Sequence, residues 1–199
     1  MNGLDLGDPK ALSLDKINLI KMKRHTDIID YIEKNPFLTN EQLESAIQEL
    51  GSFKEKEIVS FLCKMVDNDK YDWEVKNAIA LTLGDIGLDE AVPCLMKIVL
   101  DPRNNGYSGT FLYSLTIKPL QCKEYFLEFI ELLCTGNLEI RESAIILIEE
   151  FHDQVSPEVI KSSLEILSTN KVLLESNDNG RGKDGIIRFI EHVQELLSS

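Results

Sequence analysis

Apolar residues recur at helical spacing along almost the whole chain, and strand signals are nearly absent. Thr39 and Gln42 offer a capping box at the start of one expected helix. Gly51, Gly87 and Gly136 each follow an expected helix, where a C-terminal cap belongs. The pattern predicts an all-α protein. The expected helices span 14–34, 40–50, 54–67, 73–86, 89–101, 107–117, 122–135, 138–151, 156–169 and 184–198.

One apolar stripe returns every 34 residues in four of these helices. Within each helix the three positions run i, i+4, i+7, which places them on one face. Helix pairs that recur at such a spacing indicate an α-solenoid, in which stacking buries the face that one unit cannot bury alone. We therefore expect the second of the three sets, Leu62, Met96, Ile130 and Leu164, to be buried in all four helices. The three sets are Ile58, Val92, Phe126 and Ile160; Leu62, Met96, Ile130 and Leu164; and Met65, Val99, Leu133 and Leu167.

Residues 73–102 carry a more specific pattern, with Val early in the first helix, small residues inside it and a Leu-Gly close. This run resembles the HEAT-like repeats of bacterial proteins, and 138–151 repeats its first half. The resemblance covers roughly 70–170 and implies a right-handed α-solenoid of HEAT-like helix pairs. We expect one domain over 1–199, with an N-terminal cap region at 1–50, a loop at 175–185 and a capping helix at 184–198. The matching residues are Val75, Ala78, Ala80, Leu83, Gly84, Gly87, Ala91, Val92, Pro93 and Leu95.

Residues 104–144 resemble a narrower group, the small HEAT-like immunity proteins that neutralise bacterial polymorphic or contact-dependent toxins. Tyr107-Ser108 and Lys118-Pro119 depart from that pattern, so the resemblance does not identify the toxin. It implies binding to a cognate toxin domain, with Asn105, Tyr107 and Tyr113 as candidate contact residues. The matching positions are Asn105, Gly109, Thr110, Leu112, Tyr113, Leu115, Gly136, Asn137 and Glu139.

The net charge narrows the choice of partner. The chain has 21 Lys and Arg against 34 Asp and Glu, a formal net charge of -13. Nucleic acid and anionic membranes are polyanions that bind through Lys and Arg, so this balance argues against both. It suits a basic protein partner that the field attracts from a distance. The alternative is that the acidity only keeps the protein soluble.

The termini, cysteines and histidines add little chemistry. The first residues lack a signal peptide, and no apolar stretch approaches the roughly 20 residues that span a bilayer, so we expect a cytoplasmic protein. The four cysteines form no C-x-x-C pair, which predicts free thiols rather than a metal site. His25, His152 and His192 each stand alone, without the partners of a catalytic site.

Two glycine motifs also fall short of a catalytic or cofactor site. Gly180, Gly182 and Gly185 fit a dinucleotide fingerprint but lack the preceding strand, so we interpret them as a loop. Residues 106–110 miss a nucleophile elbow, because Thr110 takes the last glycine position and no strand precedes it. We predict no enzyme activity, no cofactor, no metal and no small-molecule substrate.

A row of carboxylates, here called the carboxylate ridge, is the strongest candidate site. Glu124, Glu128 and Glu131 fall within about 60° of one another around one helix, and the 34-residue step extends the row in both directions. In a solenoid this side of each second helix lines one surface, on which Lys97 would be the only opposing charge. The alternative is an ordinary polar helix face. The ridge residues are Glu90, Glu124, Glu128, Glu131, Glu158 and Glu165.

The carboxylate ridge and the resemblance over 104–144 favour an immunity protein that occludes a basic nuclease toxin, with an RNase as the preferred partner. Nuclease clefts must attract polyanions and are therefore basic, so an acidic surface can compete for them. One alternative is a HEAT-repeat scaffold or adaptor without a toxin partner. Another is an enzyme, since the repeats also resemble those of bilin lyases and of some DNA glycosylases. The acidic ridge argues against a DNA-binding groove, and no residue of this chain stands out as a lyase catalyst.

Overall fold

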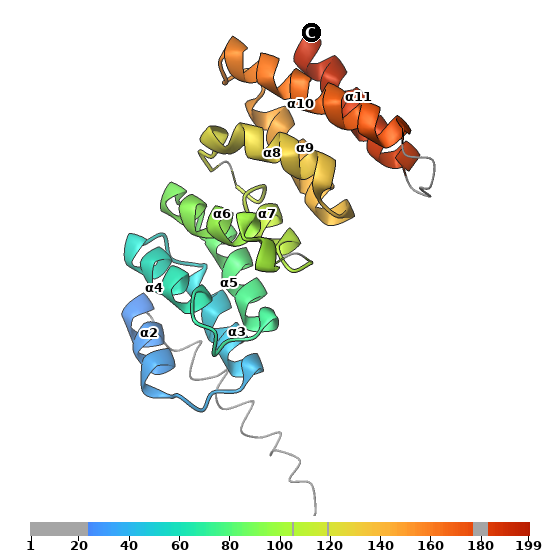
Figure 1. Cartoon of the computed structure of the whole chain (residues 1–199). Coiled ribbons are helices and arrows are strands. Elements are labelled where there is room, and N and C mark those ends of the chain that lie inside the picture. The colour runs from blue at the N-terminus through green and yellow to red at the C-terminus, as the bar shows by residue number, and fades with distance from the viewer. Residues whose placement is uncertain (1–23, 105, 119, 177–182) are drawn as a thin grey trace, which may run out of the picture. The chain divides into compact units, whose positions relative to one another are not determined.

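The computed structural model describes residues 24–104, 106–118, 120–176 and 183–199, and every regular element in these ranges is a helix (Figure 1). The predicted all-α class is confirmed. The chain divides into two compact units, Met1–Ala91 (unit 1) and Val92–Ser199 (unit 2). None of the described helices is both long and apolar enough to cross a bilayer. The expectation of a single domain over 1–199 stays a prediction.

Unit 1 is built from helix pairs joined by short turns. Thr39 and Gln42 form the predicted capping box: the Gln42 backbone N–H donates to Thr39 Oγ1 at 3.3 Å, and the Thr39 N–H donates to Gln42 Oε1 at 2.9 Å. Helix α5 packs against both α3 and α4. The elements are α2 (His25–Lys34), α3 (Asn40–Leu50), α4 (Lys56–Val66), α5 (Trp73–Ile86) and the 3-10 turn η1 (Asp89–Ala91).

Unit 2 continues the same construction. Helix α9 packs against α7 and α8, and α10 packs against α8 and α11. These contacts give a layered stack of helix pairs inside the unit, as expected for a repeat protein. The elements are α6 (Val92–Leu100), η2 (Pro102–Asn104), α7 (Gly109–Ser114), η3 (Lys123–Tyr125), α8 (Phe126–Thr135), α9 (Leu138–Phe151), α10 (Pro157–Ser176) and α11 (Lys183–Ser198).

The 34-residue register locates the core in three repeats and fails in the fourth. Leu62, Met96 and Ile130 are buried, with 0%, 1% and 0% of their surface exposed. Leu164 was expected to match them but is only half-buried, and the buried side chains of α10 are Ser163 and Leu167. Helix α10 packs mainly against α8 and α11, and Leu164 stays half-buried in this packing.

The helix bounds differ from expectation mainly at the ends. Helices predicted at 89–101 and 122–135 begin with the 3-10 turns η1 and η3, and α7 is shorter than its predicted 107–117. Helix α10 runs seven residues past the predicted 169, into the predicted loop, and α11 starts at Lys183. Residues 14–23 of the first expected helix, and Gly180 and Gly182, lie outside the described residues.

Two of the three predicted capping glycines are needed for different physical reasons. Gly87 has the left-handed φ of 67° that glycine adopts at little cost after a helix. Gly136 has an ordinary φ of -69°, but a β-carbon there would overlap the Leu132 carbonyl oxygen and the side chain of Ile140. Glycine at 136 is therefore required by space and not by backbone conformation.

Candidate protein-binding surface

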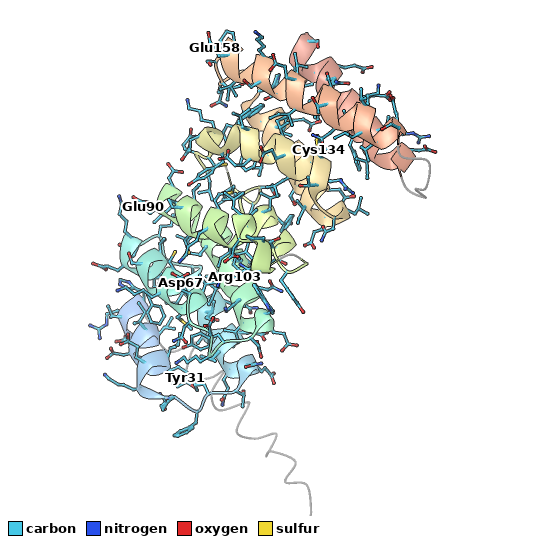
Figure 2. The ribbon with its side chains drawn as sticks, in the orientation of Figure 1. Tyr31, Asp67, Glu90, Arg103, Cys134 and Glu158 are labelled. Carbon is cyan, nitrogen blue, oxygen red and sulfur yellow. The ribbon has the colours of Figure 1, made fainter. Side chains whose placement is uncertain are left out.

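The carboxylate ridge is distributed over both units. Glu90 lies in η1 of unit 1, and the other ridge residues lie in unit 2, on η3, α8 and α10. Figure 2 labels Glu90 in the first unit and Glu158 at the start of α10 in the second. All the ridge side chains are exposed except that of Glu128, which is half-buried. The ridge members of unit 2 are Glu124, Glu128, Glu131, Glu158 and Glu165.

Glu124 does not stand on the helix that the sequence suggested. The Tyr125 N–H donates to the Cys122 carbonyl at 3.0 Å, and this short turn places Glu124 in η3. The helical-wheel argument that grouped three glutamates therefore holds only for Glu128 and Glu131, which both lie within α8. The expected spacing of the ridge along α8 is wrong at its first residue.

The ridge carboxylates differ in whether the protein already neutralises them. Glu90 pairs with Lys56 of α4, and the hydrogen bond from that ammonium holds the pKa of Glu90 below its ordinary value. The Ser156 hydroxyl, followed by the glutamate's own backbone N–H, lowers the pKa of Glu158. Four ridge carboxylates make no ion pair with any cation in the described residues. These four are Glu124, Glu128, Glu131 and Glu165.

A groove of about 530 Å³ between α8 and α10 brings two of these carboxylates together. Glu131 and Glu165 are one 34-residue step apart, and both line this groove. The register thus predicted that they would be neighbours, although it did not predict the groove. The complete lining is Glu131, Cys134 and Thr135 from α8, with Ser162, Glu165, Ile166, Thr169 and Asn170 from α10.

Three side chains of the groove lining donate hydrogen bonds within their own helices. The hydroxyl of Thr135 donates to the Glu131 carbonyl at 2.9 Å, and that of Thr169 donates to the Glu165 carbonyl at 2.8 Å. The Asn170 amide donates to the Ile166 carbonyl at 2.9 Å. Glu131 and Glu165 give the groove a negative charge, which favours a cation over an anion.

Cys134 gives the groove a neutral, largely apolar part. Its side chain is 8% exposed, and burial raises the pKa of its thiol to about 11. The nearby Arg141, whose Nε–H donates to the Leu133 carbonyl at 3.1 Å, lowers that pKa by a smaller amount. The thiol therefore stays protonated at neutral pH and packs as a small apolar group beside Ile166.

The two tyrosines that the immunity-like resemblance suggested as contact residues do not line this groove. Tyr107 precedes α7 with 53% of its surface exposed, and Tyr113 lies on α7 with 47% exposed. Asn105 lies outside the described residues. Gly109 at the start of α7 lies directly against the carboxylate of Glu139 on α9, so the structure brings these two matching positions together.

The histidines make contacts that the sequence did not reveal. His192 Nε2 lies 2.8 Å from Glu149 Oε1, and a ring nitrogen of His152 lies 2.8 Å from the Glu149 carbonyl oxygen. His25 lies 3.5 Å from the Glu57 carboxylate. These are pairwise contacts, and no group of three or more potential metal ligands occurs in the described residues.

Residues 41–115 match a family model described as HEAT repeats. No curated protein matches the chain. The match begins earlier than the resemblance seen in the sequence, since it includes α3 and α4, and it ends before α8. The match supports HEAT-like repeats over this part of the chain, and such repeats typically form helical scaffolds that bind other proteins.

Proposed function

We propose that this chain is an immunity protein, which binds a basic toxin domain through the unpaired carboxylates of unit 2 and blocks its active site. The observation that supports this most directly is the absence of internal cation partners for Glu124, Glu128, Glu131 and Glu165 in the described residues. Charges kept free can be neutralised by a partner.

The favoured partner is a nuclease, and among nucleases an RNase. Enzymes that cut nucleic acid hold a polyanion in a basic cleft, and an acidic surface can compete for that cleft. Complementary charge also speeds the encounter, which matters when a free toxin is lethal. Inhibition by occupancy needs tight binding and no catalytic residue.

A scaffold or adaptor without a toxin partner is the second candidate, and the family match favours it. HEAT repeats bind many kinds of protein, and the matched residues 41–115 do not include α8 or α10, where four of the ridge carboxylates lie. The two candidates differ in where they bind. A partner that docked on the exposed tyrosines of the α7 region, or on unit 1, would favour the scaffold.

The test is growth of bacteria that co-express this chain and the toxin domain encoded beside it. Replacing Glu124, Glu128 and Glu131 together with Lys should abolish protection, because like charges would then oppose docking. Glu124 and Glu131 are exposed and Glu128 is half-buried, so these positions contribute little to folding, and helicity by circular dichroism should not change.

A matched control makes the same change of charge in unit 1, at Glu33, Glu41 and Glu49, which are all exposed. This control should protect cells as well as the wild type does. Full protection by the ridge variant, or equal loss of protection in both variants, would contradict the proposal.

A further inference from the structure

We propose that helices α7 and α9 form a second docking surface, here called the α7–α9 face, which binds a basic amphipathic helix of another protein. The α7–α9 face is defined by Tyr113, Leu138 and Ile146 and by a groove at the ends of the two helices. It is separate from the carboxylate ridge of η3, α8 and α10, so this inference goes beyond the proposed function and does not rest on it. Three observations support it: exposed apolar side chains in one region, an apolar groove that continues from them, and carboxylates beside both.

Three large apolar side chains are exposed on α7 and α9. Tyr113 of α7 is 47% exposed, and Leu138 and Ile146 of α9 are 59% and 47% exposed. Leu138 and Ile146 fall within about 80° of each other around α9, so both lie on one side of that helix. Apolar residues scattered singly over a surface are normal, but a group of them on neighbouring helices, with polar residues around it, marks an interaction site.

The packing of the two helices brings these side chains into one region. Gly109 at the start of α7 lies against the Glu139 side chain near the start of α9. Leu115, directly after α7, lines the same groove as Ile146. Helices α7 and α9 therefore run side by side in the same direction. Tyr113 is consequently level with the middle of α9, between the two exposed apolar residues of that helix.

An apolar groove of about 300 Å³ continues from this group, and Ile146 belongs to both. Pockets for small molecules have volumes of about 300–1,000 Å³, so this groove is at the lower end of that range. Its size suits one or two anchoring side chains of a docked helix, whose other apolar residues would cover the exposed group. The apolar residues of the lining are Leu115, Ile117, Leu120, Ile146, Leu147 and Phe151.

The carboxylates beside this apolar surface favour a basic helix. Glu139, Glu142 and Glu150 of α9 are exposed, and none of them makes an ion pair with another described residue. Among the described residues that line the groove, Lys118 is the one cation. Lys or Arg residues that flank the apolar stripe of a docking helix would therefore meet mainly opposite charge. A second copy of this chain would instead bring further acidic residues, since its net charge is -13.

The test uses a model helix and needs no toxin. The probe is a fluorescein-labelled peptide of about 14 residues, built from Leu and Lys with Leu at positions i, i+3, i+4 and i+7. The matched probe has the same composition in an order without helical periodicity. Fluorescence anisotropy with the full chain should show saturable binding of the first peptide at a stoichiometry of one. The second peptide, which carries the same charge, should bind at least tenfold more weakly.

Apolar variants locate the binding site. Leu138→Ser together with Ile146→Ser should weaken binding of the helical peptide at least tenfold. The matched control is Val172→Ser with Leu173→Ser on α10, where the side chains are 63% and 55% exposed, and it should leave binding unchanged. Because all four positions are exposed, these substitutions should not alter helicity by circular dichroism.

Charge variants provide a second measurement that does not change the apolar surface. Glu142→Gln with Glu150→Gln should weaken binding at least threefold at low salt, because two carboxylates beside the groove are then neutral. Glu131→Gln with Glu165→Gln makes the same change of net charge on α8 and α10 and should leave binding nearly unchanged. Equal losses in the two charge variants would show that the peptide responds only to net charge, which would overturn the inference.

Other outcomes would also contradict the α7–α9 face. Equal binding of both peptides, or unchanged binding by the Leu138 and Ile146 variant, would overturn the inference. Light scattering of the chain without peptide tests the remaining occupant. A dimer that the Leu138 and Ile146 variant separates would show that a second copy covers this face, and a basic helix would then be the wrong partner.

Discussion

Unit 1 and unit 2 are almost equally acidic, yet they use their charges differently. Residues 1–91 contain 11 Lys and Arg against 18 Asp and Glu, a net charge of -7, and residues 92–199 contain 10 against 16, a net charge of -6. In unit 1 the ridge residue Glu90 is paired with Lys56. In unit 2 four ridge carboxylates have no cation partner among the described residues. At the ridge positions the two units differ in the pairing of their carboxylates and not in the amount of charge.

The same contrast occurs at one position of the repeat. Glu90, Glu124 and Glu158 are each 34 residues apart. The first pairs with the Lys56 ammonium, the second makes no ion pair with any other described residue, and the third accepts a hydrogen bond from the Ser156 hydroxyl. The register of the repeat therefore predicts where a side chain lies on a helix. The residues of neighbouring segments determine which groups that side chain contacts.

The largest expected effect tests whether the two units are separate folding units. Phe126→Ala in unit 2 and Leu62→Ala in unit 1 each remove a side chain that is at most 1% exposed. We expect each to lower the free energy of unfolding by about 2–5 kcal/mol through the lost burial and the cavity left behind. Hydrogen exchange read by mass spectrometry should place the faster exchange mainly within the mutated unit.

If both variants accelerated hydrogen exchange equally in both units, the two units would unfold together. The two units would then not be separate folding units. A shared, undivided response would also favour the single domain that the sequence suggested.

A smaller effect is expected where unit 2 needs a glycine for space. Gly136→Ala would press a methyl group against the Leu132 carbonyl and the side chain of Ile140, so we expect a loss of about 1–3 kcal/mol, the usual range for overpacking. The control is Gly109→Ala, where the methyl group would meet only the far end of the Glu139 side chain, which can move aside. Chemical denaturation of both variants measures the difference. Equal losses would show that the contact at Gly136 relaxes as easily as the one at Gly109.

The sequence predicted the helices well because their signals are local. Thr39 and Gln42 alone determine one cap, and the bounds of α3, α5 and α9 agree with expectation at both ends. The burial of Ile130 was also predictable, since the repeat surrounds it with similar neighbours. Local pattern and repetition are sufficient where every repeat sees the same environment.

The sequence failed where the environment changes. Leu164 repeats the pattern, but its burial depends on how α10 packs against α8 and α11, which the register does not determine. The groove between Glu131 and Glu165 depends on how closely α8 approaches α10, and the contact of His192 with Glu149 joins residues 43 apart. Contacts of this kind depend on how two elements pack against each other, and the periodic pattern of a sequence does not determine that packing.

The smallest expected effect sharpens the comparison between the two units at a single ion pair. Lys56→Gln removes the partner of Glu90 and gives unit 1 one unpaired ridge carboxylate, as in unit 2. Stability by chemical denaturation should not change measurably, because exposed ion pairs contribute little. The pKa of Glu90, now below its ordinary value because of Lys56, should rise toward that value when read by NMR titration.

If the ridge attracts a basic toxin by long-range charge, the association rate of the Lys56→Gln variant should increase slightly at low salt and return to the wild-type value as salt screens the field. An increase that persisted at high salt would mean that Glu90 contacts the partner directly, and a decrease would mean that Lys56 itself does.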